Sequence, residues 1–321
     1  MSDLKKMQLE QAKDLALIAQ TGFDTSEIDM NVHFSNDPTR PGYNSAGEYT
    51  NDFVYSEVGG AVYGYGGDDI LMGGNSGQYH FFGGAGNDTV AYEVANQGAT
   101  IALDPNVFGP YPTLSNGGAA AGDTYNSIEN VVGTRFDDTI YGTAGANKLY
   151  GGGGDDSLYG GGGNDVINGG DGNDEIWGLI SGTSVLTGGD RVDPATGANV
   201  WGHDVFDLLI EGGHNFNVTI TDFHPIIWTG NTAPTAQQAF ADPIHDALRL
   251  TFDTSTGVTT DAEADAAFVK TNGVPFQISG HDVVFTVHTG NVDGTIRLQG
   301  AADQIDATHH FTVYDFAVHP N

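Results

Sequence analysis

The chain has 321 residues, of which 42 are Asp or Glu and 10 are Lys or Arg, so its formal net charge at pH 7 is −32. This charge makes nucleic acids and anionic membranes poor partners and cations good ones. Cysteine is absent, which excludes disulfides, thiolate metal sites and cysteine nucleophiles, and no apolar run is long enough to span a membrane.

Residues 1–60 form an N-terminal segment whose composition differs from that of residues 61–210. The amphipathic stretch SDLKKMQLEQAKDLALIAQ, residues 2–20, predicts a helix. Residues 36–47 contain two prolines and two glycines, which is typical of a loop. We therefore expect a short, partly helical segment that caps the domain after it, and no known motif indicates its function.

Residues 61–210 are dominated by a nine-residue pattern, G-G-x-G-x-D-x-U-x, in which U is a large aliphatic residue. Full copies occupy residues 83–91, 151–159, 160–168 and 169–177, and weaker copies occupy 64–72, 133–141 and 142–150. A flexible linker has no reason to keep an aliphatic residue at a fixed phase, so the pattern indicates a folded repeat. One buried aliphatic side chain stabilises by about 1.5–3 kcal/mol, less than the conformational entropy lost by nine ordered residues. We therefore expect that the repeats do not fold unaided.

The pattern is similar to the nonapeptide of the RTX (repeats-in-toxin) family of secreted calcium-binding proteins. This resemblance implies an all-β fold: a parallel β-roll in which each repeat forms a glycine-rich turn and a short strand, and two repeats complete one coil. The aliphatic residues then point into the roll, because alternate strand residues face opposite ways. They are Ile140, Leu149, Leu158, Ile167 and Ile176.

In this family, the carbonyls at repeat positions one, two and four and the Asp at position six bind Ca²⁺. Glycine turns and carboxylates agree with this chemistry, because Ca²⁺ prefers oxygen ligands. The resemblance implies several ions, held by Gly83, Gly84, Gly86, Asp88, Gly151, Gly152, Gly154, Asp156, Gly160, Gly161, Gly163, Asp165, Gly169, Gly170, Gly172 and Asp174, with Asp69, Asp138 and Asp204 as further ligands. Asn147 stands at position six of its repeat, which predicts a weak site or none.

Two segments interrupt the repeats, residues 92–132 and 190–201. The sequence GDTYNSIENVVGTRFDDTIYG, residues 122–142, resembles segments that re-enter the repeats of RTX proteins, so we predict one discontinuous roll. Residues 202–208, GHDVFDL, resume the pattern after the second interruption.

Residues 211–321 alternate like β-strands, with a helix predicted at 261–270 after the capping box Thr260-x-x-Glu263. This order resembles the C-terminal segment of RTX proteins, which caps the roll and carries the type I secretion signal. We therefore expect secretion to the cell exterior or surface through type I machinery.

No signature of a zinc protease, serine esterase or phosphate-loop enzyme occurs in the chain, so we expect that it is not an enzyme. We predict a structural or adhesive protein of a matrix, surface layer or biofilm, which folds when it binds Ca²⁺ outside the cell. The alternatives are a secreted RTX hydrolase or lyase and a lectin-like carbohydrate-binding module. Aromatic residues 18 apart end three strands on one face, which predicts a ladder for a second protomer, a surface or a glycan: Tyr141, Tyr159 and Trp177.

Overall fold

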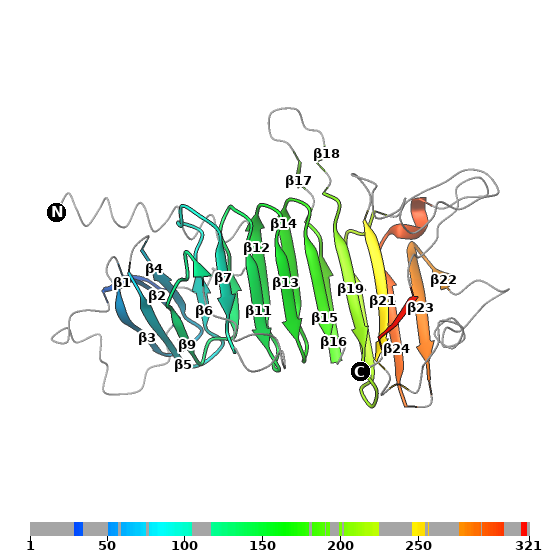
Figure 1. Ribbon diagram of the computed structural model, residues 1–321, viewed down its shortest axis with the longest axis horizontal. Coiled ribbons are helices and arrows are strands. Elements are labelled where there is room, and N and C mark those ends of the chain that lie inside the picture. The colour runs from blue at the N-terminus through cyan, green and yellow to red at the C-terminus, as the bar shows by residue number, and fades with distance from the viewer. Residues whose placement is uncertain are drawn as a thin grey trace. The chain divides into compact units, whose positions relative to one another are not determined.

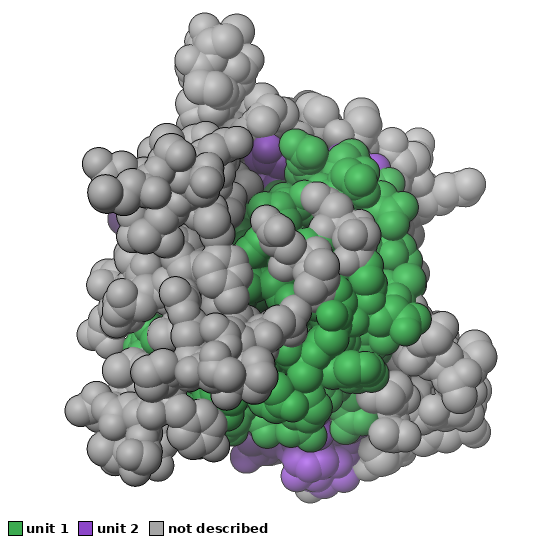
Figure 2. Space-filling view, turned by 90° about the vertical axis from the view of Figure 1, so that its left-hand side faces the viewer, with its two compact units in different colours: residues 1–143, 148–153 green, residues 144–147, 154–321 purple. Residues whose placement is uncertain are grey.

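The computed structural model of the chain describes residues 29–34, 51–56, 59–74, 77–104, 117–179, 182–189, 191–192, 199–200, 202–224, 246–253, 256, 276–289, 291–304 and 316–319. Strands make up nearly all of its regular structure (Figure 1), and η2 (Ala301–Gln304) is a 3₁₀ helix of one turn. Within these ranges, no helix is long and apolar enough to cross a membrane. The chain divides into two compact units, residues 1–143 with 148–153 and residues 144–147 with 154–321 (Figure 2).

Unit 1 is built from parallel strands that return to the same sheet after each coil. One sheet has the order β1-β2-β4-β6-β10-β12, a second has β3-β5-β9, and a third has β11-β7-β8, in which only β7 and β8 are antiparallel. The strands are β1 (Asp29–Phe34), β2 (Asp52–Ser56), β3 (Gly60–Gly66), β4 (Ile70–Gly73), β5 (Tyr79–Ala85), β6 (Thr89–Ala91), β7 (Ala99–Ala102), β8 (Gly117–Gly118), β9 (Thr124–Asn126), β10 (Asn130–Val132), β11 (Thr139–Thr143) and β12 (Lys148–Gly153).

The aliphatic residue of each repeat stacks on its counterpart in the next coil. Leu71 pairs with Val90, Val90 with Val131 and Val131 with Leu149, and none of the four is exposed to solvent. Since one such residue recurs per strand, the core of unit 1 is a narrow row of side chains.

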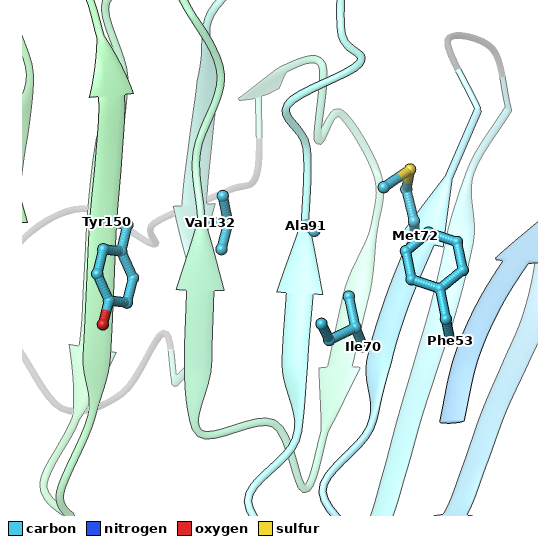
Figure 3. Packing of buried hydrophobic residues seen from close by; sticks show 6 residues of the cluster. All are labelled: Phe53, Ile70, Met72, Ala91, Val132 and Tyr150. Atoms are coloured by element: carbon cyan, nitrogen blue, oxygen red, sulfur yellow. The ribbon is translucent and has the colours of Figure 1, made fainter. Parts of the chain in front are cut away.

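The opposite face of the same sheet is also buried. Its side chains form a cluster that runs across five neighbouring strands (Figure 3), and Val94 from the segment after β6 packs against it. The members of the cluster are Phe53, Ile70, Met72, Ala91, Val132 and Tyr150. This second layer gives unit 1 more apolar burial than the repeat pattern predicts.

The segment 92–132, which interrupts the repeats and is called the excursion below, leaves the roll after β6. It returns as β10, which pairs in register with β6. Along the way, β7 joins the sheet of β11 and β9 joins that of β5. Asp123 holds the excursion to the roll, because its Oδ1 accepts the Tyr79 N–H at 2.7 Å and its Oδ2 accepts the Tyr92 hydroxyl at 2.6 Å. The Tyr92 hydroxyl also lies 2.7 Å from that of Tyr125, and burial raises the pKa of both tyrosines.

Unit 2 has the same kind of architecture and contains antiparallel strands near its C-terminal end. One sheet has the order β14-β16-β20-β24-β23-β22, another has β13-β15-β19-β21-β25, and β17 and β18 form an antiparallel pair. The strands are β13 (Ser157–Gly161), β14 (Val166–Asp171), β15 (Glu175–Leu179), β16 (Gly182–Thr187), β17 (Arg191–Val192), β18 (Asn199–Val200), β19 (Val205–Ile210), β20 (Phe216–Ile220), β21 (Ala247–Asp253), β22 (Phe276–Ser279), β23 (Asp282–His288), β24 (Asp293–Leu298) and β25 (Phe316–His319).

The core row of unit 2 widens toward its C-terminal strands. Leu158 pairs with Ile176, and Ile176 with Phe206, so a phenyl ring replaces the aliphatic side chain of the repeats. Strands β22, β23 and β24 pair antiparallel and close one sheet of this unit.

The predicted all-β parallel roll is confirmed, and so is the burial of the five aliphatic residues predicted to face inward. The helices predicted within residues 2–20 and 261–270 lie outside the described residues. The predicted domain boundaries near residues 60 and 210 stay predictions.

Candidate metal centre

Seven aspartates occupy the same place in the fold, the last turn residue before a strand. All are buried, although their carboxylates belong to turns rather than to the apolar core. They are Asp69, Asp88, Asp138, Asp156, Asp165, Asp174 and Asp204. A buried carboxylate is costly unless it is paired, hydrogen-bonded or bound to a metal.

One oxygen of most of these carboxylates is used to join successive coils. The Asp174 Oδ1 accepts the N–H of Asp156, 18 residues earlier, at 2.8 Å. The same bond, from the amide of the earlier coil to the carboxylate of the later one, recurs along both units. It joins Asp52 to Asp69, Asp69 to Asp88, Asn147 to Asp165 and Asp174 to Asp204.

The other oxygen, Oδ2, points back into the turn that precedes it. In six turns, a Cβ on the glycine at repeat position one would collide with this oxygen, so the carboxylate occupies the space that a side chain would need. The glycines are Gly64, Gly83, Gly133, Gly160, Gly169 and Gly188. The Oδ2 atoms of Asp69, Asp88 and Asp174 are buried and accept no hydrogen bond, which is the condition that a bound cation relieves.

The backbone conformation explains why positions two and four of the repeat are glycine. Their φ angles are positive in all four full repeats, a conformation that side chains disfavour. These glycines are Gly84, Gly86, Gly152, Gly154, Gly161, Gly163, Gly170 and Gly172.

Burial is the first cause of a raised pKa at six of these carboxyls, because the charged form loses its hydration. For Asp204 the neighbouring Asp246 carboxylate adds the next largest contribution. The pKa values are raised to about 6 for Asp88 and Asp138, about 7 for Asp69, Asp165 and Asp174, and about 9 for Asp204. A divalent cation would favour the charged form and reverse this shift.

The residue at position five has a structural role that the sequence interpretation missed. The Asp155 Oδ1 accepts the N–H of Asn173 at 2.9 Å, and the Asn173 Oδ1 accepts that of His203 at 2.9 Å. Donor and acceptor are reversed relative to the position-six bond, since here the later coil donates. The presence of Asp or Asn at position five of every full repeat was a signal for this ladder: Asn87, Asp155, Asn164 and Asn173.

Not every turn offers a free carboxylate oxygen. The Asp138 Oδ2 accepts the N–H of Thr134 at 2.5 Å, and its Oδ1 accepts the Thr134 hydroxyl at 3.0 Å. At the C-terminal end, the Asp246 Oδ2 accepts the N–H of His224 at 2.7 Å. In these two turns protein donors replace a cation, so Asp138 fits the predicted ligand role less well than Asp174 does.

Asp222 is a further residue that the repeat pattern does not reveal. Its two oxygens accept the N–H groups of Gly188 and Gly189 at 2.9 and 2.8 Å. It lies outside any nonapeptide, and only the return of the chain after β20 brings it to this turn.

The predicted glycine ligands all lie in turns or at the strand ends next to them. Gly83 and Gly84 are in β5, Gly151 and Gly152 in β12, Gly160 and Gly161 in β13, and Gly169 and Gly170 in β14. Among the described residues, no group of three or more His, Cys, Asp or Glu side chains could hold a metal alone. Any ion here would therefore need the turn carbonyls besides one carboxylate per turn, and a donor set of neutral and anionic oxygens suits Ca²⁺.

Fold and turns together define a class: a parallel β-roll whose glycine-rich turns present buried aspartates for cation binding. A comparison with protein families matches the RTX calcium-binding nonapeptide repeat in four copies, over residues 62–76, 80–92, 132–167 and 153–180. These segments are therefore copies of the RTX calcium-binding nonapeptide repeat. A comparison with curated proteins finds no match.

Proposed function

We propose that this protein is a secreted, extracellular structural or adhesive protein that folds when its repeats bind Ca²⁺. The orphaned, buried Oδ2 atoms of Asp69, Asp88 and Asp174 are the observation that carries the proposal. These oxygens are unfavourable in a calcium-free fold, and the carbonyls of neighbouring turns give an ion the remaining oxygens. Binding and folding are then one equilibrium.

The calcium concentration outside cells sets the place where the protein folds. Extracellular calcium modules typically bind with dissociation constants of about 10⁻⁴–10⁻³ M, well above the free calcium of a cell interior. The chain would stay unfolded inside the cell, pass a type I secretion channel and fold outside. The fold supports the proposed structural role, since a stack of coils bonded edge to edge is a repetitive element that can be extended.

The ions would be held by the aspartates at position six and the glycine carbonyls of the full repeats. The four turns concerned contain Asp88, Asp156, Asp165 and Asp174, with Asp69 and Asp204 in the flanking turns. Calcium supplies charge neutralisation and crosslinks successive turns. The protein residues position the oxygens, and the two ladders at positions five and six hold the coils in register.

The test is the particle size and β content of the full chain with and without calcium. Light scattering and circular dichroism at calcium concentrations of about 10⁻³ M should show a compact β protein, and the same sample in EGTA should expand and lose its β signal. A chelated sample that keeps an unchanged, cooperatively unfolding β structure would contradict the proposal.

A further inference from the structure

An aromatic row lies on the outward face of the β3-β5-β9 sheet of unit 1, beside the candidate calcium ligands Gly83 and Gly84 of β5. The Tyr63 ring stacks on Phe82 with 4.8 Å between ring centroids and on Tyr65 with 5.6 Å. The planes are inclined by only 14° and 18°, so the three rings form one stack. Tyr63 remains 40 % exposed and Tyr65 61 % exposed, although stacking usually serves to bury rings.

Tyr65 occupies this place at a conformational cost. Its φ is 74°, in the left-handed region that a bulky residue rarely adopts. It stands at position two of the repeat 64–72, where the four full repeats all have glycine. Backbone strain of this kind persists where the surrounding structure enforces it and is concentrated at functional sites.

The partner strand leaves the Tyr65 ring uncovered. The residue opposite Tyr65 on β5 is Gly84, which has no side chain to shield the ring. Beyond Phe82 the same row continues to Asn126 on β9, and the adjacent row contains His80 and Thr124, whose Nδ1 and Oγ1 lie 2.8 Å apart. The aromatic stack is thus bordered by exposed imidazole, hydroxyl and amide groups.

The strands of this face contain His80 as their only titratable residue besides tyrosine, in a chain whose net charge is −32. Strands β3, β5 and β9 contain no Asp, Glu, Lys or Arg. An anionic ligand would find no basic side chain on these strands, and a second copy of the chain would bring its own charge of −32. A neutral ligand meets neither obstacle.

We propose that this row, Tyr63, Tyr65 and Phe82 with His80, Thr124 and Asn126, is a binding site for a neutral glycan. Sugar rings present apolar C–H faces, which pack against aromatic rings, and hydroxyl groups, which exchange hydrogen bonds with imidazole, hydroxyl and amide groups. Exposed aromatic side chains bordered by such groups are typical of recognition surfaces. The proposal deepens the adhesive role proposed above and rests on it.

The experiment compares the folded full chain with three variants on insoluble neutral glycans. Microcrystalline cellulose, chitin and agarose are the probes, in millimolar CaCl₂, and the measured quantity is the bound fraction as a function of protein concentration. We expect the parent to bind at least one probe and Tyr63→Ser to bind about tenfold more weakly or worse. Phe136→Ser, which removes an aromatic side chain that is 37 % exposed and lies outside β3, β5 and β9, should bind like the parent.

Tyr65→Gly is the decisive variant, because glycine relieves the positive φ while it removes the ring. We expect a calcium midpoint of folding within about twofold of the parent together with a loss of glycan binding of about tenfold or more. If Tyr65→Gly binds the glycans as tightly as the parent does, the proposal is overturned. It is also overturned if the parent binds none of the three probes. Calcium-dependent dimerisation that Tyr65→Gly abolishes, without glycan binding, would assign the face to a second copy instead.

Failure of this proposal can be distinguished from failure of the calcium-dependent fold. A parent that folds with calcium but ignores all three glycans contradicts only the glycan site. A parent whose fold is indifferent to EGTA contradicts the proposed folding mechanism, whatever it binds.

Discussion

At the scale of single residues, the aspartates at positions five and six of the repeat have different tasks. Asp155 gives one oxygen to the amide of Asn173, whereas Asp174 gives Oδ1 to the amide of Asp156 and turns Oδ2 into the glycine-rich bend. An amide oxygen can replace the first kind of acceptor, as the asparagines at position five of the other full repeats show. It cannot replace the charge of the second.

Asp174→Asn should therefore weaken calcium binding much more than Asp155→Asn. The amide can keep the bond to Asp156, but it removes the buried anionic oxygen. A lost charged interaction costs about 1.5–3 kcal/mol, so the calcium midpoint should rise about tenfold or more. Calcium titration followed by circular dichroism measures this midpoint.

Asp155→Asn is the matched control for this change. It removes the same charge from the neighbouring coil and keeps the acceptor, so its free energy of unfolding should stay within about 0.5 kcal/mol of the parent. Equal calcium midpoints for the two variants would show that position six is no more important for metal binding than position five.

At the scale of elements, the turns restrict which residues the repeat can contain more strongly than the strands do. The glycine at position one leaves room for a carboxylate oxygen, and the glycines at positions two and four adopt positive φ. The strand positions are less restrictive, because the inward, buried position is occupied by Leu, Ile, Val or Phe in different strands.

Two glycine-to-alanine changes near the same coil should have opposite results. A Cβ at Gly169 would collide with the Asp174 carboxylate and the Gly188 carbonyl, so Gly169→Ala should destabilise by about 1–3 kcal/mol and raise the calcium midpoint. A Cβ at Gly178 would meet only the Leu208 Cδ2 at 3.4 Å, an ordinary contact. Gly178→Ala should leave thermal unfolding in calcium unchanged or raise its midpoint, and similar losses for both variants would contradict this account of the turn.

The repeat made the roll and its turn aspartates predictable, because period nine fixes strand, turn and inward side chain together. The inward placement of Leu158 and Ile176 followed from phase alone. Contacts made by segments without a period could not be predicted in this way. Asp222 reaches Gly188 only after the chain has passed through β20, and Thr134 donates to Asp138 from within a turn that lacks two glycines. Val94 packs from the excursion against the buried cluster that contains Tyr150.

At the scale of the whole molecule, charge and burial work against the calcium-free fold. Six of the buried turn aspartates have pKa values raised from 3.8 to between about 6 and about 9. A carboxyl whose folded pKa exceeds its unfolded pKa binds more protons in the folded state, so stability falls as pH rises through the interval between the two. The stabilising effect is complete below the unfolded value near 3.8 and is lost progressively up to about 9.

Acid should therefore substitute in part for calcium. In EGTA, the β signal of the chain should increase as the pH is lowered from about 8.5 to about 5.5, contrary to the usual acid response of proteins with salt-bridged carboxylates. Circular dichroism at low protein concentration measures this change. A double variant, Asp165→Asn with Asp174→Asn, should respond less to pH, and a β signal that falls on acidification would contradict the assignment of raised pKa values.

The bonds from Asp156 to Asp174 and from Asn173 to Asp155 tie two coils of unit 2 that are 18 residues apart, and equivalent bonds tie the second of these to the coil of Asp204. Under tension along the chain, coils at a free end can detach one after another, because each is bonded only to its neighbours. Each detached coil releases about 60 Å of extended chain, at roughly 3.3–3.6 Å per residue. A tether of this kind lengthens in steps instead of breaking, and it recoils when calcium restores the coil.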